Sequence, residues 1–257
     1  MELRHPIEFS IITPVWDRLN TIKPFFSSLL ENTDWSRAEL IVVDQGSRPF
    51  ITNYVIDAIR TLPQFRLIRN RTNVGVPRAW NLGLRVSEGN IVICISSDLI
   101  IPRGWLDELR RVLMFPKAGC VSISSQDVID KGLCLQEVVQ GGNGIRVRRA
   151  IGNTGEMMCF TRGTQKRLGY FNEEYGLYGE EDADWGLRIG ALGLLNLYSA
   201  DMLIERVHVE DEAEHDSVKG DEDGSRRRLI LKRYAEYQTG RSAYVPYKPD
   251  IVGPVPT

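Results

Sequence analysis

Short apolar runs alternate with amphipathic stretches between residues 9 and 114. The apolar runs predict strands at Phe9–Val15, Glu39–Val43, Phe65–Arg69 and Ile91–Ile95. Stretches with helical spacing of their apolar residues lie between and after these runs, at about 19–30, 54–62, 77–87 and 104–114. Alternation of strands and helices predicts parallel strands joined by right-handed crossovers, and therefore an α/β fold.

The pattern changes from about Cys120. Further strands are predicted at 120–125, 156–161, 194–198 and 202–209, with helices starting near Asp184 and covering 225–238. Residues 130–151 are rich in glycine and basic side chains, which predicts a hairpin or a mobile loop. The acidic segment 210–223 predicts a solvated loop, and the proline-rich end from Tyr244 predicts an extended tail. Either loop, at 130–151 or at 210–223, could instead serve as a lid over a substrate.

Composition narrows the class of protein. A length of 257 residues suits one large α/β domain or two small ones, and a net charge of −2 argues against a general nucleic-acid binder. The sequence contains no run of 18 apolar residues, so we expect no membrane span. The first ten residues lack the apolar core of a signal peptide. The four cysteines show no zinc-ligand spacing, so we expect free thiols and a reducing, cytoplasmic location.

Two aspartates follow the ends of predicted parallel strands. Asp98 ends the sequence Ser96-Ser97-Asp98 directly after the run Ile91–Ile95, and Asp44 follows the second strand. The carboxyl ends of parallel strands form the edge where open α/β sheets bind ligands, so the two carboxylates suit a nucleotide with a metal ion. The alternative is structural, because aspartate at a strand end also forms turns and caps helices.

The segment NVGVPRAWNLGL at 73–84 predicts a loop that leads into a helix. Arg78 and Asn81 lie three residues apart and would share a helix face, with Arg78 near the N-terminus and able to reach a diphosphate. The alternative is a surface arginine. Neither a glycine-rich dinucleotide turn after the first strand nor a phosphate-loop motif occurs, which argues against NAD binding and P-loop ATP hydrolysis.

Four acidic residues crowd the start of the helix near residue 184, in the sequence Glu180-Glu181-Asp182-Ala183-Asp184. Acidic side chains in a first helical turn interact favourably with the helix dipole, which is a structural explanation. Mutual repulsion also raises the pKa of at least one such carboxyl, which suits a general base. His208 ends a predicted strand and is either structural or, beside a carboxylate-bound metal, a further ligand.

Five segments, in this order, carry a family resemblance: TPVWDR, ELIVVDQGS, NVGVPRAWNLGL, ICISSDLIIPRGWL and YGEEDADWGLRI. The chain resembles the family-2 inverting glycosyltransferases of GT-A fold over about residues 9–192. The resemblance implies one GT-A domain over 1–243: a mostly parallel, Rossmann-like sheet flanked by helices, a smaller acceptor-side sheet and a C-terminal helix. It divides into a nucleotide-sugar half (9–115), an acceptor half (116–209) and an acidic loop with the last helix (210–243), before the tail 244–257.

The resemblance also implies roles for individual residues. The donor-binding set it implies is Thr13, Pro14, Asp44, Asn73, Arg78, Ser97 and Asp98. Asp182 is the expected catalytic base, Glu181 orients the acceptor, and Asp98 and His208 bind the metal. Ser96 stands where the family's D-x-D motif has its first aspartate, so one carboxylate ligand is missing.

The expected activity is transfer of a sugar from a nucleotide-diphosphate sugar, with UDP as the first guess, to the hydroxyl of an acceptor such as a glycan or lipid-linked glycan. The expected cofactor is Mn²⁺ or Mg²⁺. Two alternatives remain open: a non-catalytic module of the same fold that binds a sugar nucleotide or glycan, and a sugar-nucleotidyltransferase. The latter class usually has a glycine-rich signature and a lysine after the first strand, and this chain has neither.

Overall fold

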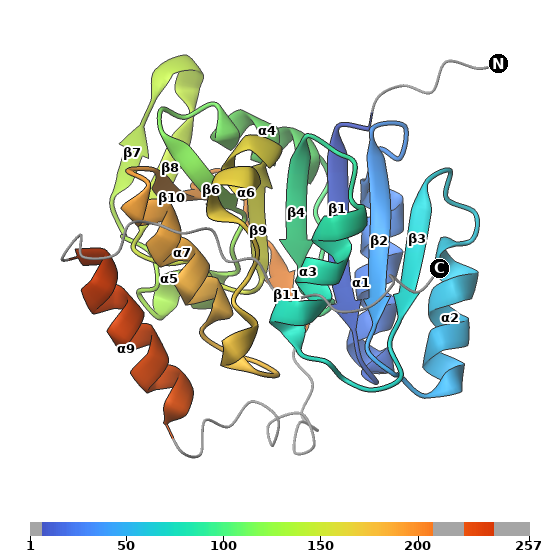
Figure 1. Cartoon of the computed structure of the whole chain (residues 1–257). Coiled ribbons are helices and arrows are strands. Elements are labelled where there is room, and N and C mark those ends of the chain that lie inside the picture. Colours follow the sequence, from blue (N-terminus) through green and yellow to red (C-terminus); the bar gives the residue numbers. More distant parts are fainter. Residues whose placement is uncertain (1–6, 208–223, 239–257) are drawn as a thin grey trace.

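The computed structural model describes residues 7–207 and 224–238, which form a layered α/β structure (Figure 1). The first half contains β1 (Phe9–Val15), α1 (Leu19–Asn32), β2 (Ala38–Asp44), α2 (Pro49–Ile59), β3 (Phe65–Arg69), α3 (Val76–Val86), β4 (Ile91–Ile95), β5 (Leu99–Ile100) and α4 (Trp105–Leu113). The second half contains β6 (Ala118–Ser122), α5 (Gln126–Asp130), β7 (Val138–Gln140), η1 (Gly142–Gly144), β8 (Arg146–Ala150), β9 (Met157–Thr161), α6 (Arg162–Leu168), η2 (Glu173–Tyr175), α7 (Glu181–Ala191), β10 (Leu195–Ser199), β11 (Glu205–Arg206) and α9 (Ser225–Gln238).

The main sheet has the strand order β3-β2-β1-β4-β9-β6-β10-β8-β7. β1, β2, β3 and β4 are parallel, as the alternating pattern predicts. β9 runs antiparallel to both of its neighbours, and β8 runs antiparallel to β10 and β7, so these two strands oppose the rest of the sheet. The mostly parallel sheet with flanking helices is confirmed, and a second, two-stranded sheet of β5 and β11 is present.

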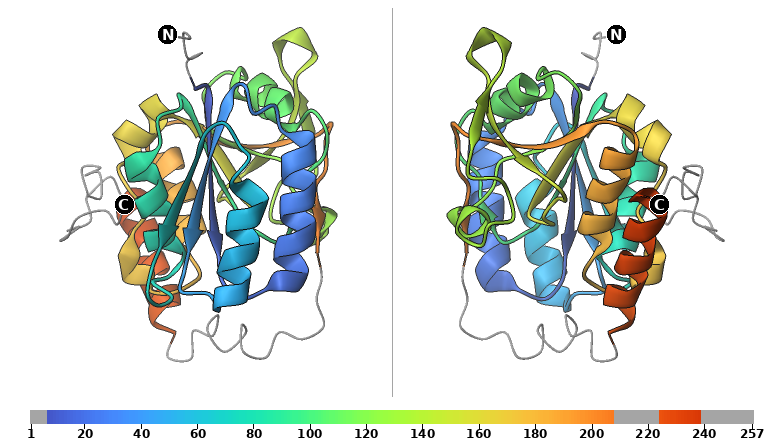
Figure 2. Two further views of the ribbon diagram at one scale, coloured as in Figure 1. Left: turned by 90° about the vertical axis from the view of Figure 1, so that its right-hand side faces the viewer. Right: turned by 90° about the vertical axis from the view of Figure 1, so that its left-hand side faces the viewer.

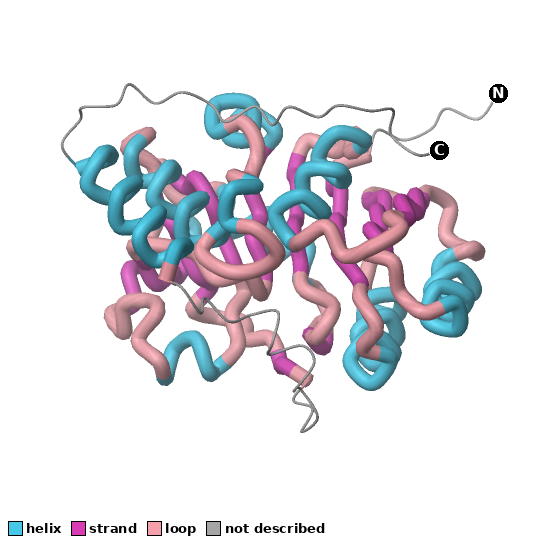
Figure 3. The backbone as a smooth tube through the Cα atoms, turned by 60° about the horizontal axis from the view of Figure 1, so that its bottom comes forward, coloured by secondary structure: helices cyan, strands magenta, loops and turns pink. Residues whose placement is uncertain are grey.

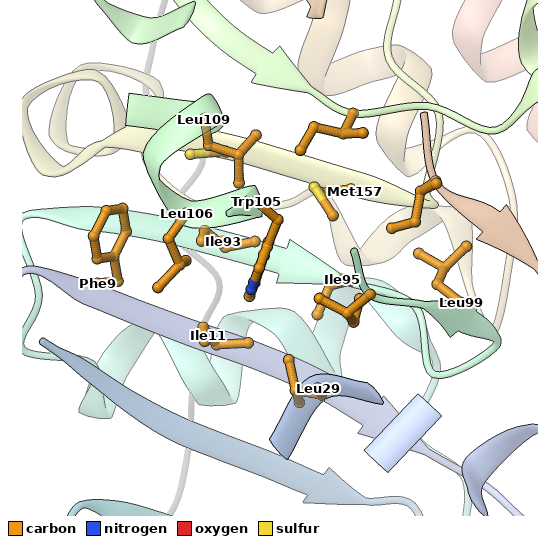
Figure 4. Packing of buried hydrophobic residues seen from close by; sticks show 14 of the residues in the cluster. Phe9, Ile11, Leu29, Ile93, Ile95, Leu99, Trp105, Leu106, Leu109 and Met157 are labelled. Atoms are coloured by element: carbon orange, nitrogen blue, oxygen red, sulfur yellow. The ribbon is translucent and has the colours of Figure 1, made fainter. Parts of the chain in front are cut away.

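Helices cover both faces of the sheet (Figure 2). Alternate residues of β4 enter two separate apolar clusters: Ile93 and Ile95 pack with α1, α2 and α4, whereas Val92 and Cys94 pack with α3, α6 and α7. Figure 4 shows the first cluster around Trp105, whose indole N–H donates to Thr33 Oγ1 at 3.2 Å. A strand that is buried on both faces reads as a continuous apolar run, which is why β4 is plain in the sequence.

The structure differs from the sequence prediction in several places. α2 begins at Pro49 rather than near residue 54. The apolar but exposed Phe50 obscures the helical spacing of the buried Ile51 and Val55, so the sequence pattern did not show the start of this helix. α6 was missed because it is largely polar, although Thr161 Oγ1 caps it by accepting from Thr164 N. α5 was missed as well, and the strand expected at 202–209 reduces to the two residues of β11, whose only sheet partner within the described residues is the equally short β5.

Other segments of the second half follow the prediction. β7 and β8 form the hairpin that was one of the two expectations for 130–151, and α9 covers the expected helix. The acidic segment 210–223, His208 and the tail 244–257 lie outside the described residues. The four cysteines are buried and unbridged. Among residues 7–207 and 224–238, no helix is both long and apolar enough to cross a bilayer.

Candidate active site

Two adjoining pockets open where loops follow the carboxyl ends of the parallel strands. Figure 3 brings this edge of the sheet forward. The first pocket, about 90 Å³ in volume, lies against the ends of β1, β2 and β4. The second, about 210 Å³, lies between the ends of β1 and β4 and the start of α7. The residues that line both pockets are Pro14, Val76, Ser96, Asp98, Tyr178 and Arg206.

The first pocket combines an aromatic ring with amide side chains. Trp16, Gln45 and Asn73 line it together with Arg18, and Ser97 lies in the same wall. Gln45 Oε1 accepts a hydrogen bond from the Val74 N–H at 3.2 Å, which ties the end of β2 to the loop before α3. Such a mixture of apolar surface with a few polar groups is typical of pockets that bind small organic molecules.

Asp98 lies at the junction of the two pockets and is only 7% exposed. Its Oδ1 accepts a hydrogen bond from Ser96 Oγ. Its Oδ2 accepts from Arg206, with Nε at 3.1 Å and Nη2 at 3.0 Å. The carboxylate is therefore held in place by one neutral and one cationic partner.

The residues around Asp98 provide an incomplete set of metal ligands. A carboxylate oxygen is the kind of donor that Mn²⁺ and Mg²⁺ bind, and Asp98 fits that role. Within the described part of the chain, no group of three or more histidine, cysteine, aspartate or glutamate side chains is arranged to hold a metal ion. The second predicted ligand, His208, lies outside the described residues. Asp98 is thus the one of the two predicted ligands that the structure describes, and its carboxylate is already paired with Arg206.

The acidic wall of the second pocket depends on close backbone packing. Gly75 has φ +90°, and a Cβ there would lie 2.5 Å from the Gly176 carbonyl oxygen. The Val76 N–H donates to the Leu177 carbonyl at 2.8 Å. These contacts fix the loop before α7 against the start of α3. Consequently, Glu181 and Asp182 in the first turn of α7 face the second pocket.

Burial raises the pKa of both carboxyls in this turn. For Glu181, desolvation is the main cause of the raised pKa, and the nearby charge of Asp182 adds to it. For Asp182, desolvation again raises the pKa, and hydrogen bonds from the backbone amides of Ala183 and Gly155 oppose the shift. Glu181 Oε2 and Trp80 Nε1 are buried and have no hydrogen-bond partner among the described residues, and both residues line the second pocket.

Asp184, two residues further along α7, has a different environment. Its Oδ2 accepts from Arg188 Nε at 2.9 Å, and its Oδ1 accepts from the Tyr175 hydroxyl at 3.2 Å. Arg188 also donates to the carbonyl oxygens of Leu168 and Tyr170. Asp184 therefore anchors α7 rather than facing a pocket.

The predicted site residues are distributed unevenly. The pocket walls include Pro14, Asn73, Ser97, Asp98, Glu181 and Asp182. Thr13 and Asp44 are buried outside these walls. Asp44 accepts from the Ser47 N–H at 2.9 Å and from Thr52 Oγ1 at 2.6 Å, contacts of the kind that a turn-forming aspartate makes. Its predicted contact with the donor stays a prediction.

Arg78 and Asn81 share a helix face, as their spacing predicts, but that face contacts the segment before α7. Asn81 Nδ2 donates to the Phe171 carbonyl and to Glu173 Oε1, and Arg78 Nε lies 4.0 Å from Glu173. Arg78 is not part of either pocket wall. Its predicted contact with the nucleotide stays a prediction.

Several wall residues were not predicted from the sequence. Gln45 directly follows Asp44 and Trp80 lies next to Asn81, so each was one residue away from a position that was considered. Trp16 and Tyr178 belong to the quoted motifs, but aromatic residues are usually core residues. Arg206 belongs to no sequence motif, and it reaches the site through the pairing of β11 with β5.

Solved structures with a similar fold include glycosyltransferases. A mannosyltransferase from Pyrobaculum calidifontis, in complex with GDP-Man and Mn²⁺, matches with a TM-score of 0.68 and 20% identity over 94% of this chain and 66% of that chain. S. aureus TarS in complex with UDP-GlcNAc matches with a TM-score of 0.68 and 18% identity over 90% of this chain and 69% of that chain. The layered sheet with its edge pockets is thus a GT-A fold.

Sequence comparison identifies the family. Residues 10–155, more than half of the chain, match the model of glycosyl transferase family 2. The chain belongs to this family. An uncharacterized protein of Sinorhizobium fredii is 32% identical over 44% of this chain, and an uncharacterized glycosyltransferase of Synechocystis is 30% identical over 40% of it. These matches cover 12% and 33% of the relatives' own lengths.

Proposed function

We propose that the protein is an inverting hexosyltransferase that moves a sugar from a nucleotide-diphosphate sugar to an acceptor hydroxyl. The observation that carries the proposal is the joining of two pockets at Asp98, with Asp182 in the wall of the second. The first pocket takes the nucleotide and the second takes the acceptor. The proposed division into a nucleotide half (9–115) and an acceptor half (116–209) follows the same line, because most of the first pocket's wall comes from residues before 99.

Asp182 is the proposed general base. Burial raises the pKa of Asp182 toward neutral pH, and a carboxylate with a higher pKa is a better proton acceptor. Asp182 takes the proton from the acceptor hydroxyl as that oxygen attacks the anomeric carbon. The bond from the anomeric carbon to the diphosphate breaks on the opposite face, and its electron pair leaves with the nucleotide. One displacement therefore inverts the configuration at that carbon.

The neighbours of Asp182 suit the binding of an acceptor. Glu181 Oε2 and the Trp80 indole N–H are buried polar groups without a partner in the described structure, and each costs free energy until it is hydrogen-bonded. Hydroxyl groups of an acceptor can satisfy both, because a hydroxyl donates as well as accepts. Glu181 would then orient the attacking oxygen beside Asp182.

The proposed donor complex includes a divalent cation, Mn²⁺ or Mg²⁺. The mannosyltransferase of the same fold was solved with GDP-Man and Mn²⁺. In this chain Asp98 and His208 would hold the ion. When bound, such an ion offsets the negative charge of a diphosphate. UDP remains our first proposal for the nucleotide.

Thermal stability with a panel of nucleotides tests this function. The purified protein is heated with UDP, GDP, CDP or dTDP, each in Mn²⁺, Mg²⁺ or EDTA. A ligand that binds only the folded state raises the melting temperature, so one nucleotide should stabilise the protein more than the others do. The sugar nucleotides of that base are then tested for release of the nucleoside diphosphate. No stabilisation by any nucleotide would overturn the proposal. Stabilisation without any release of nucleotide, even with a range of glycan acceptors, would favour the non-catalytic module.

A further inference from the structure

The two-stranded sheet places an arginine beside Asp98. In the antiparallel pairing of β11 with β5, Arg206 lies opposite Leu99, the residue after Asp98. The Val207 N–H then donates to the Asp98 carbonyl at 2.8 Å. The backbone on both sides of Arg206 is thereby held against residues 98–100, so the position of its side chain is fixed by sheet pairing as well as by charge.

Arg206 occupies the junction of the two pockets. Among the described residues that line both pockets, it is the one cation. Its side chain is 29% exposed and contacts Asp98, whose side chain is 10% exposed. Asp98 engages the Nε and Nη2 side of the guanidinium. This leaves the Nη1 corner for a second anionic partner, since a guanidinium presents five N–H donors in one plane.

We propose that Arg206 binds the diphosphate of the donor, and that Asp98 acts on it as a positioning residue. The proposal rests on the function proposed above, in which the diphosphate lies between the nucleotide pocket and the acceptor pocket. A guanidinium matches the geometry of phosphate oxygens, and charge-assisted hydrogen bonds to phosphate are stronger than neutral ones. The positive charge of Arg206 is therefore placed where negative charge collects as the leaving group departs.

Among the described residues that line both pockets, Asp98 is the one carboxylate. Ser96 stands beside Asp98 and contributes a hydroxyl rather than a second negative charge. Asp98 and Arg206 together are close to neutral, so a diphosphate that approaches them meets a hydrogen-bond donor rather than uncompensated acid. Part of the diphosphate affinity should for this reason persist without a divalent cation.

Binding measurements on Arg206→Gln and Arg206→Lys test the proposal. Isothermal titration follows UDP and GDP, with uridine and guanosine as probes that lack phosphate, in Mn²⁺ and again in EDTA. Arg206→Gln should weaken nucleoside diphosphate binding about tenfold or more in both conditions, because charge-assisted bonds are lost. Binding of the nucleoside should change less than about twofold. Arg206→Lys keeps the charge without the fork and should lie between the wild type and Arg206→Gln.

Arg103→Gln is the matched control, because it removes a surface arginine whose side chain is 83% exposed and pairs with Glu31 at 3.0 Å. It should bind both probes like the wild type. Unchanged diphosphate binding by Arg206→Gln would overturn the inference, and so would an equal loss of nucleoside and diphosphate binding, which would indicate a structural role. If the wild type itself bound no nucleoside diphosphate, the proposed function would fail, and this inference with it.

Discussion

Asp182 and Asp184 lie two residues apart on α7 and serve different regions of the molecule. Asp182 lines the second pocket, where burial raises its pKa. Asp184 is enclosed beneath it, paired with Arg188 and hydrogen-bonded to Tyr175. Asp98 and Asp44 repeat the contrast at two strand ends, one at the pocket junction and one in a turn. An acidic residue at the carboxyl edge of the sheet is therefore not enough to define a site, because its hydrogen-bond and ion-pair partners decide whether it is open to a ligand.

Among the changes considered in this comparison, removal of Asp184 should lower the stability of the protein the most. Asp184→Ala leaves Arg188, whose side chain is 4% exposed, without its anionic partner. Loss of one member of a buried ion pair typically costs about 3–5 kcal/mol of unfolding free energy. Urea denaturation measures the change. Asp107→Ala is the control, because its pair with Arg37 leaves Asp107 71% exposed and should be worth less than about 1 kcal/mol. Equal effects of the two substitutions would contradict the role given to Asp184.

The turn after β2 offers a second test, of whether Asp44 stabilises the fold through its hydrogen bonds. Asp44→Ala removes the acceptor of the Ser47 N–H and of Thr52 Oγ1, both buried. Leaving buried donors unsatisfied should lower the unfolding free energy by about 1–3 kcal/mol. The same denaturation experiment measures it. A variant of unchanged stability that had lost nucleotide binding would show instead that Asp44 acts on the ligand.

The pocket-facing acids should reveal themselves in the pH dependence of stability. A raised pKa in the folded state means that folding binds protons, so the stability linked to Glu181 is present at low pH and is lost as pH rises through the folded pKa. Between the unfolded and the folded pKa of one such group, the unfolding free energy falls by about 1.4 kcal/mol per pH unit as pH rises. Glu181→Gln should therefore stabilise the protein more at about pH 9 than at about pH 5. Melting curves across this range would refute the assignment if both proteins showed the same slope.

A smaller effect is expected in the first pocket. Gln45→Ala removes an amide from its wall and should weaken nucleotide affinity about fivefold to tenfold, the usual scale for one neutral hydrogen bond. Gln126→Ala is the control, because that side chain pairs with Asp130 on the surface. Titration of the stabilising nucleotide measures both variants. Identical affinities would remove Gln45 from the nucleotide contacts.

Much of the fold could be predicted because the core strands carry their own signal. β4 is a continuous apolar run, β1 and β2 are mostly apolar, and the parallel order of the three follows from the alternation with helices. α6 escaped prediction because it is largely polar and begins at the Thr161 side-chain cap, without an apolar stripe along its length. Short elements such as β5 and β11 depend on pairing between distant residues, which no local pattern shows.

The candidate site was likewise predictable only where local sequence patterns place its residues. Asp98, Glu181 and Asp182 reach the pockets because they stand at a strand end and a helix start, positions that the sequence indicates. The environment of Arg78 was not predictable, because Glu173, its ion-pair partner, comes from a segment 95 residues further along the chain. Arg206 joins Asp98 across an even longer separation, of 108 residues. Side-chain partners of this kind follow only from the three-dimensional arrangement.

The most direct test of the account is the turnover of Asp182→Asn, measured beside its affinity for the donor nucleotide. Asparagine has nearly the same shape as aspartate but cannot accept a proton at neutral pH. We expect donor affinity and melting temperature close to those of the wild type, with kcat lower by about 100-fold or more, the usual scale for a lost general base. A kcat near that of the wild type would contradict the central claim that Asp182 takes the proton from the acceptor.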